Sequence, residues 1–88
     1  MQYYFHSDPG HAWLAVKRKE LIQLGILDKI SSFSYQKGST VYLEEDCDAG
    51  VFLDAKKAAG EEITRNNIRD SYQENTPIRN YKNFTIKA

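Results

Sequence analysis

The stretch Thr40-Val41-Tyr42-Leu43-Glu44-Glu45-Asp46-Cys47-Asp48 decides the fold, because an alternating apolar run leads directly into four carboxylates and then into the start of a helix. Alternation of apolar and polar side chains, as in its first half, is typical of a half-buried strand. Beyond Asp48, apolar residues recur at helical spacing, and Gly60 suits the left-handed position after a helix. We therefore expect a strand followed by a helix over 48–59, which Asp48 caps and whose apolar stripe covers a sheet.

A partner for this strand lies just upstream, in Phe33-Ser34-Tyr35. Gln36-Lys37-Gly38 fits a three-residue hairpin loop in which the glycine adopts the left-handed conformation and forms a bulge. This register pairs Phe33 with Val41 and puts four side chains on one face of the sheet: Phe33, Tyr35, Val41 and Leu43. A two-residue loop would instead place Tyr35 on the face of Tyr42, and we prefer the first register.

An earlier hairpin is predicted by two aromatic runs, Gln2 to His6 and Ala12 to Val16, which flank Asp8-Pro9-Gly10. Pro followed by Gly suits a type II turn, in which Gly10 takes the position that requires a positive φ. The first hairpin is therefore expected to turn at this glycine.

A first helix is expected over Lys17 to Leu24. Gly25 can take the left-handed position after it, while Ile26 packs back on Leu21 in a Schellman arrangement. No capping residue precedes the segment and three cations oppose the helix dipole, so this helix should be about two turns long.

After Gly60 the chain becomes rich in Asn, Arg and Lys and poor in apolar anchors. Ile63, Ile68 and Tyr72 would hold a loop or short helix, and Pro77 marks a break because it disfavours helix at the residue before it. The remaining apolar residues would supply a last strand or an arm across the sheet: Ile78, Tyr81, Phe84 and Ile86. We expect one α+β domain, a small antiparallel sheet built from two hairpins and covered by one or two helices, with a compact core over 1–62 and a polar C-terminal extension over 63–88.

Composition limits the function classes. Lys plus Arg and Asp plus Glu are balanced at 12 each, which argues against a generally basic nucleic-acid binder. The single Cys47 cannot form an intramolecular disulfide, and a reducing cytoplasm fits this usage. We find no signal peptide and no run of about 18 apolar residues that could span a bilayer, so we expect a cytoplasmic protein without membrane contact.

The acidic end of the central strand is the best candidate for a partner-binding site. Glu44, Glu45 and Asp46 would supply negative charge that imitates nucleic-acid phosphates and occupies a basic groove on a partner protein. Tyr42 would add stacking or a hydrogen bond. The alternative is structural, because carboxylates before a helix are stabilised by its dipole by about 0.3–1 kcal/mol each. That alternative explains Asp48 better than the two glutamates.

Metal and cofactor sites are weaker hypotheses, and we predict neither. Asp46-Cys47-Asp48-Ala49-Gly50 matches only a fragment of a calcium loop and lacks the distal bidentate Glu. His6 and His11 could join Asp8 in a site with two histidines and one carboxylate. Histidines beside a tight turn more often hydrogen-bond the turn backbone.

Nucleophilic catalysis is also disfavoured, so we predict a protein that is not an enzyme. The acidic neighbours of Cys47 should raise the pKa of its thiol, and a packing role suits it better. Four serines could be proposed as nucleophiles, but none lies in a G-x-S-x-G elbow or near a histidine: Ser31, Ser32, Ser34 and Ser39.

A competing hypothesis is a small nucleic-acid-binding or regulatory protein that uses the basic C-terminal region. Cations there would contact phosphates and an aromatic ring would stack on bases. The residues are Arg65, Arg69, Arg79, Lys82 and Tyr81. A protein-binding patch or homodimer face is a further reading of the many aromatic residues near the N-terminus, which are Tyr3, Tyr4, Phe5 and Trp13.

Several motifs together give the chain a family resemblance. They are His11-Ala12-Trp13-Leu14, Leu24-Gly25-Ile26, Ile30-Ser31-Ser32-Phe33-Ser34-Tyr35, the stretch from Tyr42 to Asp48, and Ile78-Arg79-Asn80-Tyr81. With these motifs the chain resembles small uncharacterised proteins of bacterial phages, plasmids and genomic islands, although Ala12 stands where that pattern has Gly. The resemblance implies a protein of a mobile element that binds and inhibits a host protein in the cytoplasm of a bacterial host cell. The target would be a nucleic-acid-handling defence complex, as with anti-CRISPR and anti-restriction proteins.

Overall fold

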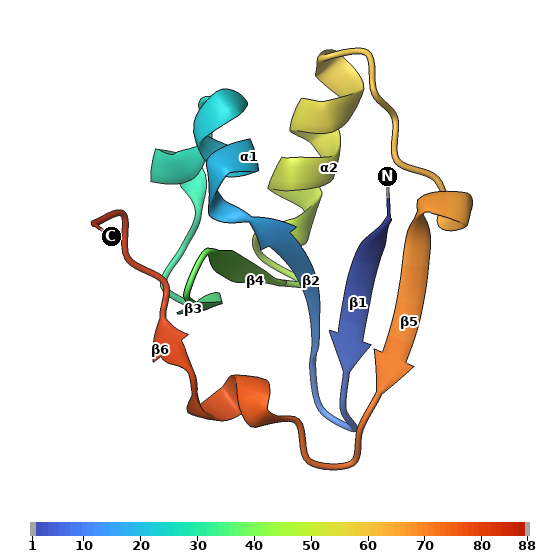
Figure 1. The fold of residues 1–88 in the computed structure, drawn as a ribbon, viewed down its shortest axis with the longest axis vertical. Helices are drawn as coiled ribbons and strands as arrows, with labels where there is room; N and C mark the ends of the chain where they lie inside the picture. Colours follow the sequence, from blue (N-terminus) through green and yellow to red (C-terminus); the bar gives the residue numbers. More distant parts are fainter. Residues whose placement is uncertain (1, 88) are drawn as a thin grey trace.

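The computed structural model describes residues 2–87, which form a six-stranded mixed sheet and two α-helices (Figure 1). Neighbouring strands run in the order β5-β1-β2-β4-β3-β6. The elements are β1 (Tyr3–Ser7), β2 (Ala12–Lys17), α1 (Arg18–Gln23), β3 (Tyr35–Lys37), β4 (Thr40–Glu44), α2 (Ala49–Ala58), β5 (Ile68–Tyr72) and β6 (Lys82–Asn83). Short 3-10 turns lie at Leu27–Lys29, Arg65–Asn67 and Pro77–Asn80. The predicted α+β class is confirmed, and both predicted hairpins are present.

The sheet is larger than two hairpins because the C-terminal part of the chain adds a strand at each edge. Strand β5 pairs in parallel with β1, and β6 pairs antiparallel with β3. Figure 1 shows β1 and β5 side by side and the segment after β5 running below the sheet to reach β6. The predicted loop or short helix around Ile68 is therefore wrong, while the predicted break at Pro77 is confirmed. The division into residues 1–62 and 63–88 stays a prediction.

The first turn differs from the predicted type II turn, because Gly10 does not have a positive φ. Instead the Asp8 carboxylate accepts hydrogen bonds from the backbone N–H groups of Gly10 and His11, at 3.0 and 2.9 Å. The requirement for glycine is one of space. A Cβ on Gly10 would lie 2.9 Å from Nη2 of Arg79, a distance that forces the arginine to move.

Helix α1 ends as predicted. Gly25 has a φ of +70°, and its N–H donates to the Ile22 carbonyl, while the Ile26 N–H donates to that of Leu21. These two bonds are the Schellman pair. The helix itself has six residues and no side-chain cap, in agreement with the unfavourable first turn in the sequence.

The β3–β4 hairpin has the register that we did not prefer. Tyr35 pairs with Tyr42 and Lys37 with Thr40, so only Gly38 and Ser39 form the loop. Gly38 has a φ of +59° at the first loop position, as a type II′ turn requires. Phe33 consequently lies outside the strand and exposes 67% of its surface.

The core lies between one face of the sheet and both helices. Alternation on β2 and β4 directs Leu14, Val16, Val41 and Leu43 to this face, where they pack with Leu21 of α1 and Phe52 of α2. Within residues 2–87 the other face carries no α-helix, and apart from Ala15 the alternate residues of β2 and β4 on that face are aromatic or polar. The chain between β5 and β6 crosses that second face, with Ile78 buried on it.

Candidate functional site

The predicted acidic cluster splits into two buried and two exposed carboxylates. Asp48 and Glu44 are 2% and 8% exposed, whereas Glu45 and Asp46 lie at the surface of the turn between β4 and α2. Glu45 is already beyond the strand, which ends at Glu44. The four residues therefore cannot act as one uniform acidic surface.

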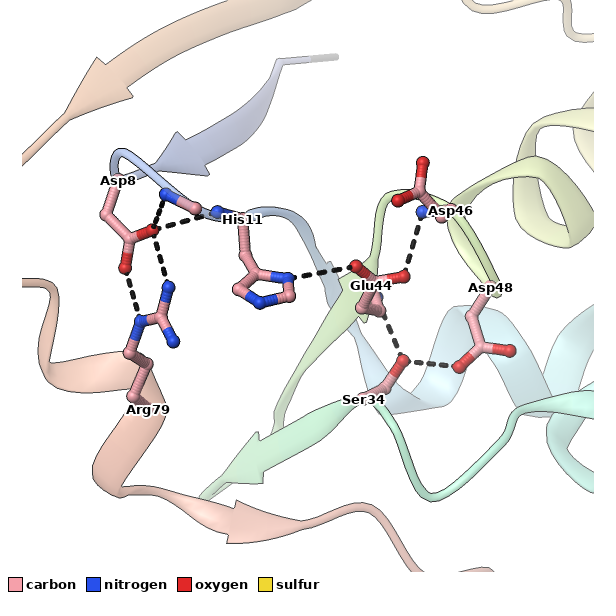
Figure 2. A network of polar contacts seen from close by, with 8 residues as sticks. Asp8, His11, Ser34, Glu44, Asp46, Asp48 and Arg79 are labelled. Atoms are coloured by element: carbon pink, nitrogen blue, oxygen red, sulfur yellow. Dashed lines mark hydrogen bonds and ion pairs between the residues drawn. The ribbon is translucent and has the colours of Figure 1, made fainter.

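Asp48 holds the chain before β3 against the start of α2. Its carboxylate accepts hydrogen bonds from the backbone N–H of Ser31 at 3.0 Å, from the Ser31 hydroxyl at 2.7 Å and from the Ser34 hydroxyl. The predicted side-chain cap is wrong, because this carboxylate makes no capping bond to α2 although Asp48 occupies the N-cap position. Its charge is used to join two segments that are separated in sequence (Figure 2).

Glu44 has a similar internal role. One oxygen accepts the Asp46 backbone N–H at 2.9 Å, and the other lies 3.6 Å from Nδ1 of His11. The backbone N–H of Glu44 donates to the Ser34 hydroxyl, which in turn donates to Asp48 (Figure 2). This chain of bonds fixes the turn that presents Asp46 and Glu45 to solvent.

A groove of about 290 Å³ opens beside this turn. Its walls combine aromatic rings, two carboxylates, a thiol and a guanidinium, contributed by His11, Trp13, Phe33, Tyr35, Glu44, Asp46, Cys47 and Arg79. Phe33 forms an exposed apolar rim, and Trp13 is almost fully buried. The groove thus offers apolar surface next to the exposed charge of Asp46.

Arg79, which lines the groove, forms an ion pair between the C-terminal segment and the first turn. Nε of Arg79 donates to the Asp8 carboxylate at 2.6 Å and Nη2 donates to it at 2.9 Å (Figure 2). Hydrogen bonding from Arg79 is the main reason that the pKa of Asp8 lies well below its ordinary value. The guanidinium also sits 5.7 Å from the ring centroid of Trp13. This contact holds the segment after β5 against the sheet.

The reactive groups near the groove have the wrong properties for a nucleophile. Cys47 is exposed, so its predicted packing role is wrong. Partial desolvation raises the pKa of its thiol, and a hydrogen bond with Glu44 and the nearby aspartates raise it further, as the sequence indicated. Ser34 is fully buried against Asp48. A thiol that stays protonated is a poor nucleophile.

The five residues of the nucleic-acid hypothesis are not brought together. Arg65 lies in a 3-10 turn, Arg69 on β5 and Lys82 on β6, at the two opposite edges of the sheet. Arg79 is engaged with Asp8, and Tyr81 packs on Tyr42 with ring centroids 5.3 Å apart. A continuous basic tail is therefore not formed.

Residues 2–87 offer neither a metal site nor a membrane span. That range contains no group of three or more His, Cys, Asp or Glu side chains arranged to hold a metal ion. His6 contacts the Tyr4 and Tyr42 rings, while His11 contacts Trp13 and Glu44, so the two histidines have separate surroundings. In the same range no helix has the length and apolar character needed to cross a bilayer.

Sequence reasoning missed three features of this region. It treated Ser31 and Ser34 only as candidate nucleophiles, although they bind Asp48. It did not pair Asp8 with Arg79, which is 71 positions away in the chain. It also did not predict that Tyr4, Tyr42 and Tyr35 lie in one row on the helix-free face of the sheet. Only the buried carboxylates carried a usable signal, since such groups require hydrogen-bond donors.

Comparisons of the chain with protein-family models, with curated proteins and with solved structures found no match. The resemblance to small proteins of phages and plasmids therefore stays a prediction. Function has to be inferred from the side chains and their geometry.

Proposed function

We propose that this chain is a non-enzymatic binding protein that docks on a basic surface of a host protein through the exposed turn between β4 and α2. The observation that carries the proposal is that two of the four carboxylates are buried and hydrogen-bonded within the protein, while the other two are exposed. Glu44 and Asp48 fix the turn from inside, and Glu45 and Asp46 project from it. Charge on a rigid turn raises association rates and loses little entropy on binding.

The groove beside the turn favours a cationic side chain of the partner. Arg and Lys have an apolar stem and a charged head. The exposed ring of Phe33 could cover the stem, while Asp46 would receive the head in a charge-assisted hydrogen bond. Tyr42 would act indirectly, because its ring packs between His6 and Tyr81 rather than in this groove.

The biological consequence follows from the family resemblance, in which such a protein inhibits a nucleic-acid-handling defence complex, as an anti-CRISPR protein does. Basic grooves that hold nucleic-acid phosphates are complementary to exposed carboxylates. Occupation of such a groove by Glu45 and Asp46 would exclude the nucleic acid. This inhibition would take place in the cytoplasm of the bacterial host and requires no cofactor.

The test is an affinity capture of the tagged protein from nuclease-treated host lysate. The informative variant is Glu45→Lys/Asp46→Lys, because both side chains are exposed, whereas a change at buried Glu44 would disturb the fold. Asp28→Lys/Asp54→Lys is the matched control, since it makes the same charge change at two exposed carboxylates on other elements. We expect wild type and control to retain one protein that the acidic-turn variant loses, with unchanged melting temperatures.

The captured protein should then lose nucleic-acid binding when the wild-type chain is added. Retention of the partner by Glu45→Lys/Asp46→Lys would contradict the proposal. Equal loss by the control would contradict it as well, because the effect would then be one of net charge.

A further inference from the structure

The helix-free face of the sheet has its own ordered arrangement of side chains. One row crosses all six strands, because Tyr4 pairs with Arg69 and Ala15, Ala15 with Tyr42, Tyr42 with Tyr35, and Tyr35 with Asn83. The row therefore reads Arg69, Tyr4, Ala15, Tyr42, Tyr35, Asn83 from edge to edge. A small residue separates two tyrosines at its centre.

The small side chain of Ala15 leaves a hollow in this row. Tyr4 and Tyr42 stand two strands apart, which is roughly 9–10 Å. The His6 ring contacts both tyrosine rings, with centroid distances of 6.1 Å to Tyr4 and 5.9 Å to Tyr42. A further planar ring in the hollow would therefore lie beside His6 and stack on the exposed ring of Tyr4. A hollow of about 310 Å³ opens here, with Tyr4, His6, Ala15, Lys17, Thr40 and Tyr42 among its walls. The Tyr4 ring is more than half exposed.

The charge on this part of the face is positive. The next row places Lys17 beside Thr40 and Thr40 beside Lys37, and both lysines are exposed. Arg69 adds a third exposed cation at the edge. Among the described strands, Glu44 is the carboxylate on this face. It lies at the end of β4 away from the lysines, where it contacts His11. Glu20 also borders the hollow, but it is buried and accepts the Tyr3 hydroxyl.

We propose that this face binds single-stranded nucleic acid, with one base in the hollow over Ala15, stacked on Tyr4, and its neighbouring phosphates on Lys17, Lys37 and Arg69. Stacking platforms interleaved with cations are the general means by which proteins hold unpaired strands. A base pair within a duplex would not fit, since its ring faces are already stacked. The segment that carries Tyr81 covers the rest of the face and limits the contact to a short length of strand.

This site is distinct from the acidic turn, and the two can be tested independently. The probe is a fluorescein-labelled oligothymidylate of about ten nucleotides, with binding followed by fluorescence anisotropy at several salt concentrations. Three cations predict a slope of about −2 for log K against log salt. Lys17→Gln/Lys37→Gln should make this slope shallower, at about −0.7. The control, Lys19→Gln/Lys29→Gln, changes two exposed lysines outside this face and should leave the slope unchanged.

The base position is tested by two variants, one that fills the hollow over Ala15 and one that removes the Tyr4 ring beside it. Ala15→Ile places a larger side chain between the tyrosines, and Tyr4→Ala removes a ring that is already exposed. Either change should weaken binding roughly 5- to 150-fold. Tyr72→Ala is the control, because Tyr72 is an exposed tyrosine of β5 in register with Ser7, outside the aromatic row, and its loss should have no effect.

Failure of the wild-type chain to bind the oligonucleotide at low salt would overturn this proposal. So would binding that Tyr4→Ala leaves unchanged, or equal affinity for a duplex of the same length. Circular dichroism checks that the Ala15→Ile variant is folded. If that variant is unfolded, the affinity of Tyr4→Ala for the oligonucleotide still tests the base position. Glu45→Lys/Asp46→Lys should retain the oligonucleotide, which separates this inference from the proposed protein-binding function.

Discussion

Tyr3 and Tyr4 are neighbours in sequence, yet they differ more than any other adjacent pair on β1. Tyr3 is 5% exposed, packs on Phe52 and donates its hydroxyl to Glu20, whereas Tyr4 is 54% exposed on the opposite face and stacks on His6. The backbone pleat alone directs them apart. The comparison teaches that the same residue type stabilises the fold on the helix-covered face and is available for binding on the other.

The largest expected difference between the two faces is in the free energy of unfolding. Leu14→Ala removes a side chain that is 1% exposed in the core, and this should cost about 2–5 kcal/mol. Tyr4→Ala on the helix-free face should lower the free energy of unfolding by only about 0.5–1 kcal/mol. Urea denaturation monitored by circular dichroism measures both. Similar costs for the two variants would mean that the helix-free face is part of the core.

A smaller effect is expected when only a hydroxyl is removed. Tyr3→Phe takes away a buried donor to the Glu20 carboxylate, with contacts of 2.9 and 3.1 Å, and should lower stability by about 1–2 kcal/mol. Tyr4→Phe should change it by less than about 0.5 kcal/mol. The urea midpoints at unchanged m-value provide the measurement. An unaffected midpoint for Tyr3→Phe would show that Glu20 does not need this donor.

The smallest effect on stability is expected where the C-terminal segment meets the helix-free face, and its pH dependence should appear only in acid. The pKa of Asp8 is lower in the folded state than its ordinary value of 3.8, chiefly because Arg79 donates hydrogen bonds to it. The stability that this carboxylate contributes is therefore present above about pH 4 and is lost as the pH falls further.

Asp8→Asn should accordingly reduce stability at pH 7 and flatten its decline below about pH 4. Arg79→Gln should have the same two effects, because it removes the partner that lowers this pKa. Urea midpoints at pH 7 and pH 3 check the pattern. An acid decline in Asp8→Asn as steep as that of the wild type would assign the effect to other carboxylates.

Local rules were sufficient for the C-terminal ends of the helices and for the pairing of the first two strands. Gly25 and Gly60 adopt the positive φ that the sequence indicated, because a residue without a Cβ has no steric penalty there. The aromatic runs around Asp8 also paired as expected, since a short turn leaves few alternative registers. These features depend on a few adjacent residues.

Local rules failed where two arrangements satisfied the same pattern. Both registers of the β3–β4 hairpin alternate correctly. In the observed register, β4 also pairs with β2 and β3 also pairs with β6. Tyr35 then pairs with Asn83, and its ring contacts that of Trp13. Likewise, Asp48 could cap α2 or bind Ser31 and Ser34, and the latter arrangement gives a buried charge more donors. Within the candidate site, the identities of Glu45 and Asp46 were predicted, but their separation from Glu44 was not.

By itself, the sequence determined the α+β class, the presence of two hairpins, the C-terminal ends of the helices and the concentrated charge after β4, because periodicity and turn chemistry act over a few residues. Only the tertiary structure decided which carboxylates are exposed, that Arg79 binds Asp8, that β5 joins β1 in parallel, and that Tyr4 and Tyr42 flank Ala15. Those outcomes depend on strands and side chains far apart in the chain, whose pairing is selected by burial and hydrogen bonding together and leaves no local pattern to read.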